Sequence, residues 1–165
     1  MSIYGALMEP DSTNIDRIDR KILARLQRDA MIQNQQLASE VGLSPSPCHR
    51  RVRALEEAGV IRGYVALLDG PSVGAGFLAY VDIRLERQAV EFSERFEKAA
   101  LARAEILECV RVTGDYDYLL KVATRDIEAF HRFLIDFLTR IKGIANTRTS
   151  IALNRVKETT ALPIG

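Results

Sequence analysis

Cysteine, net charge and long apolar runs are all scarce in this sequence, and each shortage excludes a class of protein. The chain of 165 residues holds two cysteines, Cys48 and Cys109, without metal-ligand spacing, so we expect two buried thiols in a reducing compartment. No apolar run approaches the roughly 20 residues that a membrane-spanning helix needs, and the N-terminus lacks the basic flank and apolar core of a secretory signal. The sequence therefore predicts a cytoplasmic protein with no membrane segment and no bound metal.

The net charge of the whole chain is only +1, so its overall charge gives no argument for nucleic-acid binding. The charges are nevertheless distributed unevenly. Residues 15–64 hold nine Lys/Arg against six Asp/Glu, a local net charge of +3. This asymmetry indicates a polyanionic partner for the first half of the chain.

Residues 15–57 show the spacing of three helices joined by short turns. Apolar side chains recur every three or four residues in NIDRIDRKILARLQRDA and again in NQQLASEVG, which Gly42 ends. Asn14 or Asp16 is the expected cap of the first helix. A turn of only about three residues joins the second helix to the third, and such a short connection is typical of a helix-turn-helix arrangement. VIRGYVALLD, residues 60–69, reads as a β segment that forms a wing and then leads away.

The third helix lies in LSPSPCHRRVRALEEAG, residues 43–59, where two prolines mark its start. A proline disfavours helical geometry in the residue before it. We therefore expect Ser46 to cap the helix and Pro47 to be its first residue. Ser44 followed by Pro45 is the alternative start.

This helix presents two different faces. Three side chains fall together at helical spacing and must face the core, namely Cys48, Val52 and Leu55. The opposite side and the turn before it carry side chains suited to the major groove of DNA: Ser44, Ser46, His49, Arg50 and Arg53. Arginine forks onto guanine, and the helix dipole favours phosphate at the same end. The alternative is a solvated charged face in which Arg53 pairs with a glutamate at position 56 or 57. For His49 two interpretations stay open, a contact to a base or phosphate and a plain surface residue.

A glycine-rich linker, GPSVGAG at residues 70–76, leads to a second domain. Beyond it FLAYVDIRL alternates apolar and polar side chains, and the segments follow the order β-α-β-β-α-β, which is the ferredoxin-like plan of an α+β fold. The second helix, with Asp126 near its start, is expected to turn six apolar residues inward: Ile127, Phe130, Leu134, Phe137, Leu138 and Ile141. Two helices on one face leave the other sheet face bare, so we expect the chain to dimerise.

TGDYDYLL, residues 113–120, joins two strands tightly and carries the chemistry of an α-amino-acid site. Gly114 allows a positive φ and exposes backbone N–H groups to a carboxylate. Asp115 and Asp117 offer carboxylates to an α-ammonium group. The alternative is an Asp-rich hairpin turn without a ligand, and the two interpretations are compatible.

Three stretches resemble the leucine-responsive regulatory protein/AsnC family of transcription regulators: DRIDRKILARLQRDA, LASEVGLSPSPCHRRVRALEEAGVIRGYVALLD and VTGDYDYLLKV. Residues 1–14 show no periodic pattern, so we expect them to form a mobile tail. The resemblance covers about residues 15–160 and implies three segments: a winged helix-turn-helix domain at 15–64, a hinge strand and linker at 65–76, and a ferredoxin-like effector-binding domain at 77–160. The sequence departs from the family at His49, where similar members often carry leucine or tryptophan.

Members of this family sense amino acids and regulate genes of amino-acid metabolism. The resemblance therefore implies three partners: double-stranded DNA, a small amino-acid effector, and further copies of the chain, with dimers assembling to octamers. It places the loop at an interface between dimers, where it closes the effector pocket against the last strand of a neighbour. The implied pocket residues are Gly114, Asp115, Tyr116 and Asp117 from the loop, and Thr147, Arg148 and Thr149 from the strand. No other cofactor is implied.

Two rival functions can be weighed against a regulator. An enzyme needs a nucleophile, a base and an orienting group, and His131, flanked by Phe130 and Phe133 on a helix, has no such companions in the sequence. We therefore expect no catalytic activity. An architectural DNA-compacting protein that ignores ligands fits the basic helix and the multimerising domain equally well. Titration of ligand against DNA-binding stoichiometry separates this rival from a ligand-responsive regulator.

Overall fold

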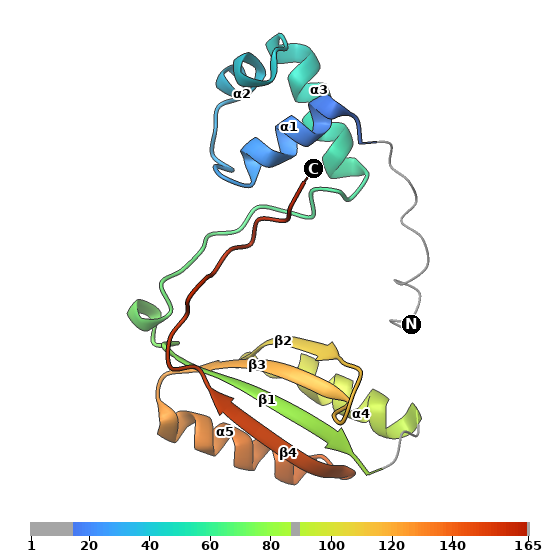
Figure 1. Cartoon of the computed structure of the whole chain (residues 1–165), viewed down its shortest axis with the longest axis vertical. Coiled ribbons are helices and arrows are strands. Elements are labelled where there is room, and N and C mark those ends of the chain that lie inside the picture. Colours follow the sequence, from blue (N-terminus) through green and yellow to red (C-terminus); the bar gives the residue numbers. More distant parts are fainter. Residues whose placement is uncertain (1–14, 87–89, 165) are drawn as a thin grey trace. The chain divides into compact units, whose positions relative to one another are not determined.

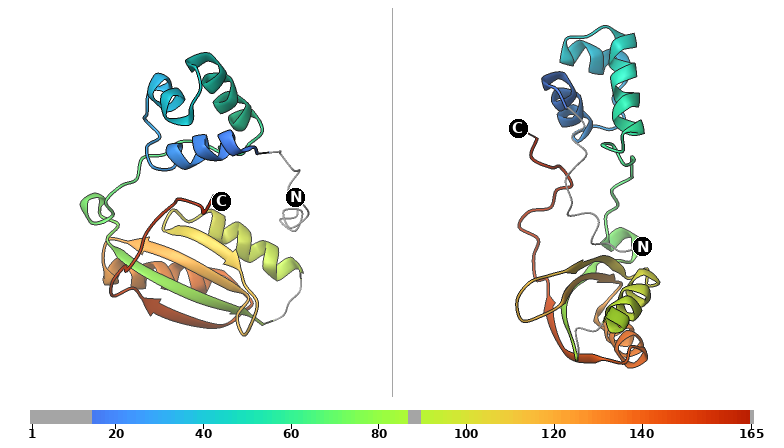
Figure 2. Two further views of the ribbon diagram at one scale, coloured as in Figure 1. Left: turned by 45° about the horizontal axis from the view of Figure 1, so that its top comes forward. Right: turned by 90° about the vertical axis from the view of Figure 1, so that its right-hand side faces the viewer.

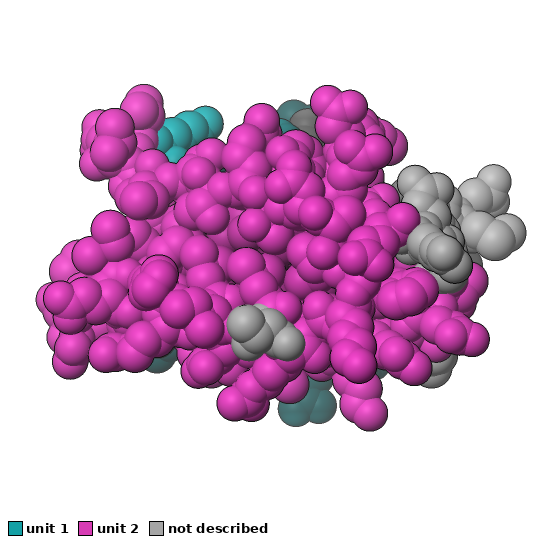
Figure 3. Space-filling model, turned by 90° about the horizontal axis from the view of Figure 1, so that it is seen from below, with its two compact units in different colours: residues 1–66, 157–165 teal, residues 67–156 magenta. Residues whose placement is uncertain are grey.

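The computed structural model describes residues 15–86 and 90–164, which form two compact units (Figure 1). The first unit comprises residues 1–66 together with 157–165, and the second comprises residues 67–156 (Figure 3). The predicted tail at residues 1–14 lies outside the described residues. The chain thus leaves the first unit, builds the second, and returns to the first.

The described residues of the first unit form three helices, α1 (Arg17–Leu26), α2 (Asn34–Val41) and α3 (Pro45–Glu57). Asp16 begins α1 with a capping box, because its side chain accepts hydrogen bonds from the N–H groups of Ile18 and Asp19 while the Asp19 carboxylate accepts from the N–H of Asp16. Gly42 ends α2 in the left-handed region at φ 79°. The predicted helix-turn-helix is therefore confirmed.

Helix α3 begins at the alternative start, with Ser44 as its N-cap and Pro45 as its first residue. The expectation of Ser46 and Pro47 is wrong, and the reason is a contact with a neighbouring helix. The side-chain amide of Asn34 donates to the carbonyl oxygen of Pro45 over 2.9 Å, which fixes the first turn against α2. Pro47 is tolerated inside the helix because the first N–H groups of a helix have no intrahelical acceptor.

Residues 60–69 form no β segment, although their sequence predicts one. Within the described part of the chain, every strand belongs to the sheet of the second unit, so this segment has no neighbour with which to pair. Its large apolar side chains are exposed, among them Val65, Leu67 and Leu68. One turn of 3₁₀ helix at Pro71–Val73 follows in the predicted linker.

The second unit is a four-stranded antiparallel sheet in the order β2-β3-β1-β4, with both helices on one face (Figure 2). Its elements in chain order are β1 (Phe77–Leu85), α4 (Val90–Leu101), β2 (Ile106–Arg111), β3 (Tyr118–Thr124), α5 (Ile127–Arg140) and β4 (Ile144–Ile151). This order is the expected ferredoxin-like plan. The other sheet face carries none of the helices or strands described for this unit.

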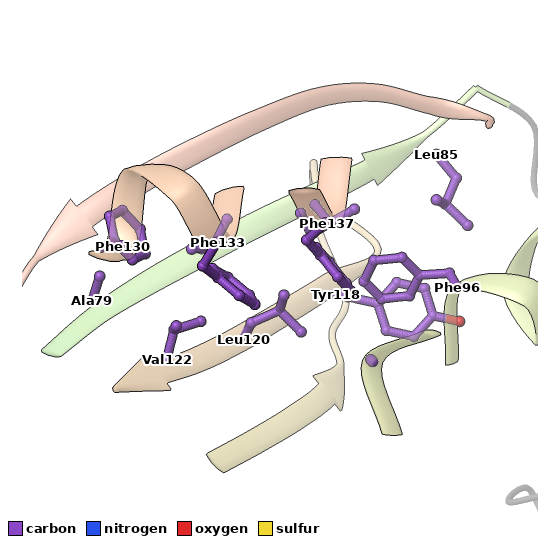
Figure 4. Packing of buried hydrophobic residues seen from close by; sticks show 12 residues of the cluster. Ala79, Leu85, Phe96, Tyr118, Leu120, Val122, Phe130, Phe133 and Phe137 are labelled. Atoms are coloured by element: carbon purple, nitrogen blue, oxygen red, sulfur yellow. The ribbon is translucent and has the colours of Figure 1, made fainter. Parts of the chain in front are cut away.

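The core of this unit lies between the sheet and the two helices, where aromatic rings pack together (Figure 4). Phe96 of α4 lies 4.6 Å from the ring of Tyr118, and the rings of Phe133 and Phe137 of α5 stack at 5.4 Å. The structure corrects one inward assignment: Ile127 occupies the first turn of α5 and is 57% exposed. Cys109, expected to be buried, is exposed on edge strand β2, whereas Cys48 is buried as predicted.

Candidate DNA-binding helix and candidate effector loop

Three polar contacts hold the helices of the first unit around their apolar core. Arg51 of α3 reaches the start of α1, where its guanidinium lies 2.7 Å from the Asp16 carboxylate and 2.9 Å from that of Asp19. Arg25 of α1 donates to Glu40 of α2 over 2.6 Å. Together with the bond between α2 and the first turn of α3, these contacts fix all three pairs of helices. Helix α3 is therefore presented at a fixed orientation within its unit.

The carboxylates in these contacts are stabilised in their charged form. The N–H of Asp19, and then the Arg51 guanidinium, hold the pKa of the Asp16 carboxyl below its ordinary value of 3.8. The Arg25 guanidinium, followed by the Gln36 amide, likewise lowers the pKa of Glu40. Both carboxylates are thus ionised at neutral pH, so the contacts between the helices are charge-assisted.

The outer face of α3 is free to meet another molecule. All five predicted DNA-binding residues are exposed: Ser44, Ser46, His49, Arg50 and Arg53. Within residues 15–86 and 90–164, no carboxylate pairs with Arg50 or Arg53. Glu56, the partner in the alternative interpretation, instead accepts a hydrogen bond from the Tyr64 hydroxyl over 2.8 Å. The structure thus favours an open cationic face over an internally paired one.

The candidate effector loop, residues 112–117, is fastened to the end of β1 through Asp117. One carboxylate oxygen of Asp117 accepts from the N–H of Leu85 over 2.8 Å, and its own N–H donates to the carbonyl of Ile83 over 2.9 Å. The contact meets β1 where the β1–β4 register shifts between Arg84 and Leu85. Gly114 at the loop tip has φ 112°, as its predicted turn requires. Asp117 therefore shapes the loop and has one further oxygen for a ligand.

Strand β4 brings only one of its three predicted residues to this loop. The Nε of Arg148 lies 2.9 Å from the Asp82 carboxylate of β1, and its guanidinium carbon lies 5.1 Å from the ring centre of Tyr116. Thr147 and Thr149 pair in register with β1 residues whose side chains are buried beneath the helices, so these threonines lie on the helix-covered face of the sheet, opposite the face that carries Arg148. Asp82 was not singled out from the sequence. Its position between the buried residues Val81 and Ile83 in the alternating strand was nevertheless a signal that its carboxylate lies on the open face of the sheet.

Across residues 15–86 and 90–164, no group of three or more His, Cys, Asp or Glu side chains is arranged to hold a metal ion. In the same ranges no helix has the length and apolar character that crossing a membrane requires. His131 is exposed on α5, in keeping with a surface residue.

Family models match both units of the chain. Residues 15–62 match the winged helix-turn-helix DNA-binding model, and residues 78–162 match the Lrp/AsnC ligand binding domain. The chain is similar to the leucine-responsive regulatory protein of Escherichia coli strain K12, with 44% identity over 151 residues that cover 92% of each chain.

Solved structures agree with this match along the chain. An AsnC family transcriptional regulator from Agrobacterium tumefaciens is similar at a TM-score of 0.86 and 40% identity, covering 90% of this chain and 96% of that one. A transcriptional regulator from Neisseria meningitidis, solved in complex with L-methionine, is similar at a TM-score of 0.85 and 39% identity over the same shares. With the braced helix-turn-helix and the ferredoxin-like unit, these matches show that the chain belongs to the Lrp/AsnC family of transcription regulators.

Proposed function

We propose that the chain is a transcription regulator of amino-acid-metabolism genes that reads DNA with α3 and responds to a small amino acid. The observation that carries the proposal is the outer face of α3, where Arg50 and Arg53 are exposed and no carboxylate in the described part of the chain pairs with them. Arginines near a helix N-terminus bind guanine edges and phosphates in the major groove. The predicted contacts of Ser44, Ser46 and His49 belong to the same proposal.

Footprinting of the DNA upstream of the gene that encodes this chain tests the proposed function. We expect a protected site with two related halves, because a dimer places two recognition helices about one DNA turn apart, roughly 34–36 Å. Protection that spreads evenly over any sequence, and stays unchanged with amino acids, would instead support the ligand-independent architectural protein.

The loop at 112–117 is the proposed effector site. Backbone N–H groups at Gly114 suit the α-carboxylate, and Asp115 with the second oxygen of Asp117 suits the α-ammonium group. Arg148, next to Tyr116, provides a further cation. Similarity to a regulator solved with L-methionine supports an amino acid as the ligand class. Thr147 and Thr149 lie on the helix-covered face of the sheet, so they would join this site only at the loop of a neighbouring chain.

Calorimetry with L-leucine and L-methionine tests the effector site. Asp115→Asn removes one carboxylate from the loop tip, where Asp115 is exposed, so we expect amino-acid affinity to fall while operator affinity in the absence of ligand is kept. Asp117→Ala should also abolish the effector response and leave DNA binding intact. Glu108→Gln, an exposed carboxylate on β2, is the matched control. Unchanged amino-acid affinity in both loop variants would refute the site.

Assembly completes the proposed mechanism. The open sheet face and exposed apolar side chains such as Leu107 support dimers, which we propose associate further to octamers in the cytoplasm. Ligand at an interface between dimers shifts the balance of assembled states only through a difference in affinity for them. Analytical ultracentrifugation with and without amino acid measures that shift.

A further inference from the structure

The segment after the sensing unit is bonded to the last turn of α1. The side-chain amide of Gln27 makes both hydrogen bonds of a peptide group with the backbone of Leu162. Its Oε1 accepts from the Leu162 N–H over 2.6 Å, and its Nε2 donates to the Leu162 carbonyl over 3.1 Å. Gln27 is itself the C-cap of α1, where its own N–H continues the helical bonding to the carbonyl of Leu23. This pairing needs an extended backbone at Leu162 and depends little on its side chain, which is 73% exposed.

An apolar anchor follows two residues later. Ile164 is half-buried and packs against the core cluster of the first unit, whose buried members include Ile22 and Leu55. The bond at Gln27 and the packing of Ile164 therefore fix the same short segment by two independent interactions, one polar and one apolar.

The other end of this segment leads straight from β4. The N–H of Ala152 donates to the carbonyl of Leu78 over 3.0 Å, so the chain is held to β1 just beyond the strand. Leu153 and Val156, in the stretch between the two attachments, are 97% and 94% exposed. Ala79 of β1 pairs in register with Ile151 of β4, so the incoming and outgoing chains leave the sheet side by side.

We propose that residues 157–164 are a structural part of the DNA-binding unit, so that two chain segments, and not one, connect it to the sensing unit. A single flexible linker lets a domain sample a wide range of positions, whereas a second attachment shortens that range. The double connection therefore limits how far the two recognition helices of a dimer can adjust their separation. The consequence for DNA rests on the proposed function: the regulator tolerates few half-site spacings.

Two pairs of variants of the full chain test the attachment. Leu162→Pro removes the N–H that donates to Gln27 and suits the extended backbone, whereas Leu162→Ala keeps that N–H. Gln27→Ala removes the amide, and Gln35→Ala, an exposed residue of α2, is its control. Hydrogen exchange of the amides at 22–27 should quicken roughly threefold to tenfold in Leu162→Pro and Gln27→Ala, and stay unchanged in both controls. Equal exchange in all four variants and the parent chain overturns the attachment.

Operator duplexes with altered half-site spacing test the consequence. Inserting about 5 base pairs, half a helical turn, should weaken binding by the parent chain at least tenfold, and by Leu162→Pro at most threefold. If the insertion weakens binding equally in the parent chain and in Leu162→Pro, the proposed restraint on half-site spacing is wrong. The hydrogen-exchange measurement then decides the attachment of residues 157–164 separately. If the parent chain binds no specific DNA, the proposed function fails, and the exchange measurement still decides whether the segment is part of the unit.

Discussion

Two adjacent arginines of α3 should behave in opposite ways when each is replaced by alanine. Arg50 is exposed and has no carboxylate partner in the described ranges, so Arg50→Ala breaks no internal contact. Arg51 makes two ion pairs with the cap of α1. Because each substitution removes one positive charge from the same helix, the two variants are matched in their long-range attraction to DNA.

The magnitudes follow from these contacts. Loss of a forked contact to a base costs about 1–3 kcal/mol, so Arg50→Ala should raise the Kd for the operator roughly fivefold to 150-fold. Its free energy of unfolding should stay within about 0.5 kcal/mol of the parent value, as for other surface changes. Arg51→Ala leaves two carboxylates together without their cation, so its melting temperature should fall while its operator Kd rises less.

Fluorescence anisotropy with a labelled operator at several salt concentrations measures the Kd values, and thermal unfolding followed by circular dichroism measures stability. The decisive comparison is between the change in operator Kd and the change in melting temperature of each variant. The assignment of the two arginines is refuted if Arg51→Ala weakens DNA binding as much as Arg50→Ala with an unchanged melting temperature. It is equally refuted if Arg50→Ala binds the operator as the parent does.

Further predictions concern stability. The fold lowers the pKa of Asp16, so the stability that its carboxylate contributes is complete above its ordinary pKa of 3.8 and is lost as the pH falls through the lower pKa of the folded state. Melting curves recorded from about pH 5 to 2 should show this loss of stability, and the loss should be smaller in Arg51→Ala. Gly143 has φ 96°, and a Cβ there would overlap the ring of Phe92, so Gly143→Ala should cost about 1–3 kcal/mol in urea unfolding. Ala145→Gly, at an exposed site of β4, should cost only about 0.5–1 kcal/mol by the same measurement. Phe96→Ala removes a fully buried ring between Tyr118 and Phe137 and should cost about 3–5 kcal/mol by the same measurement; a loss below 1 kcal/mol would contradict the packing.

The elements that the sequence predicts well are those governed by local rules. The alternation in FLAYVDIRL gives the buried face of β1 because successive side chains of any strand point to opposite faces. Gly42 ends α2 because glycine adopts the left-handed conformation without strain. These features depend on neighbours along the chain, so the helix-turn-helix and the order of the second unit could both be predicted.

The features that escaped prediction depend on partners distant in the chain. The start of α3 is fixed by Asn34 on another helix. The segment at 60–69 has strand-forming residues, yet a strand exists only where a second one lies beside it. Which arginine of α3 remains free is decided by the position of the α1 cap, and the partner of Arg148 by the register of β1 against β4. Such information enters only with the tertiary structure.

The division of the first unit into 1–66 and 157–165 has a consequence for biosynthesis. Gln27 emerges from the ribosome long before Leu162, so the nascent helices must persist without their final fastening while the intervening sheet is translated. Residues 157–164 then complete the DNA-binding unit after the sheet has been made. In topological terms the sensing domain is inserted into the DNA-binding domain, and the chain enters and leaves it at the neighbouring strands β1 and β4. An inserted domain whose ends lie close together can be replaced by another without disrupting the domain that contains it.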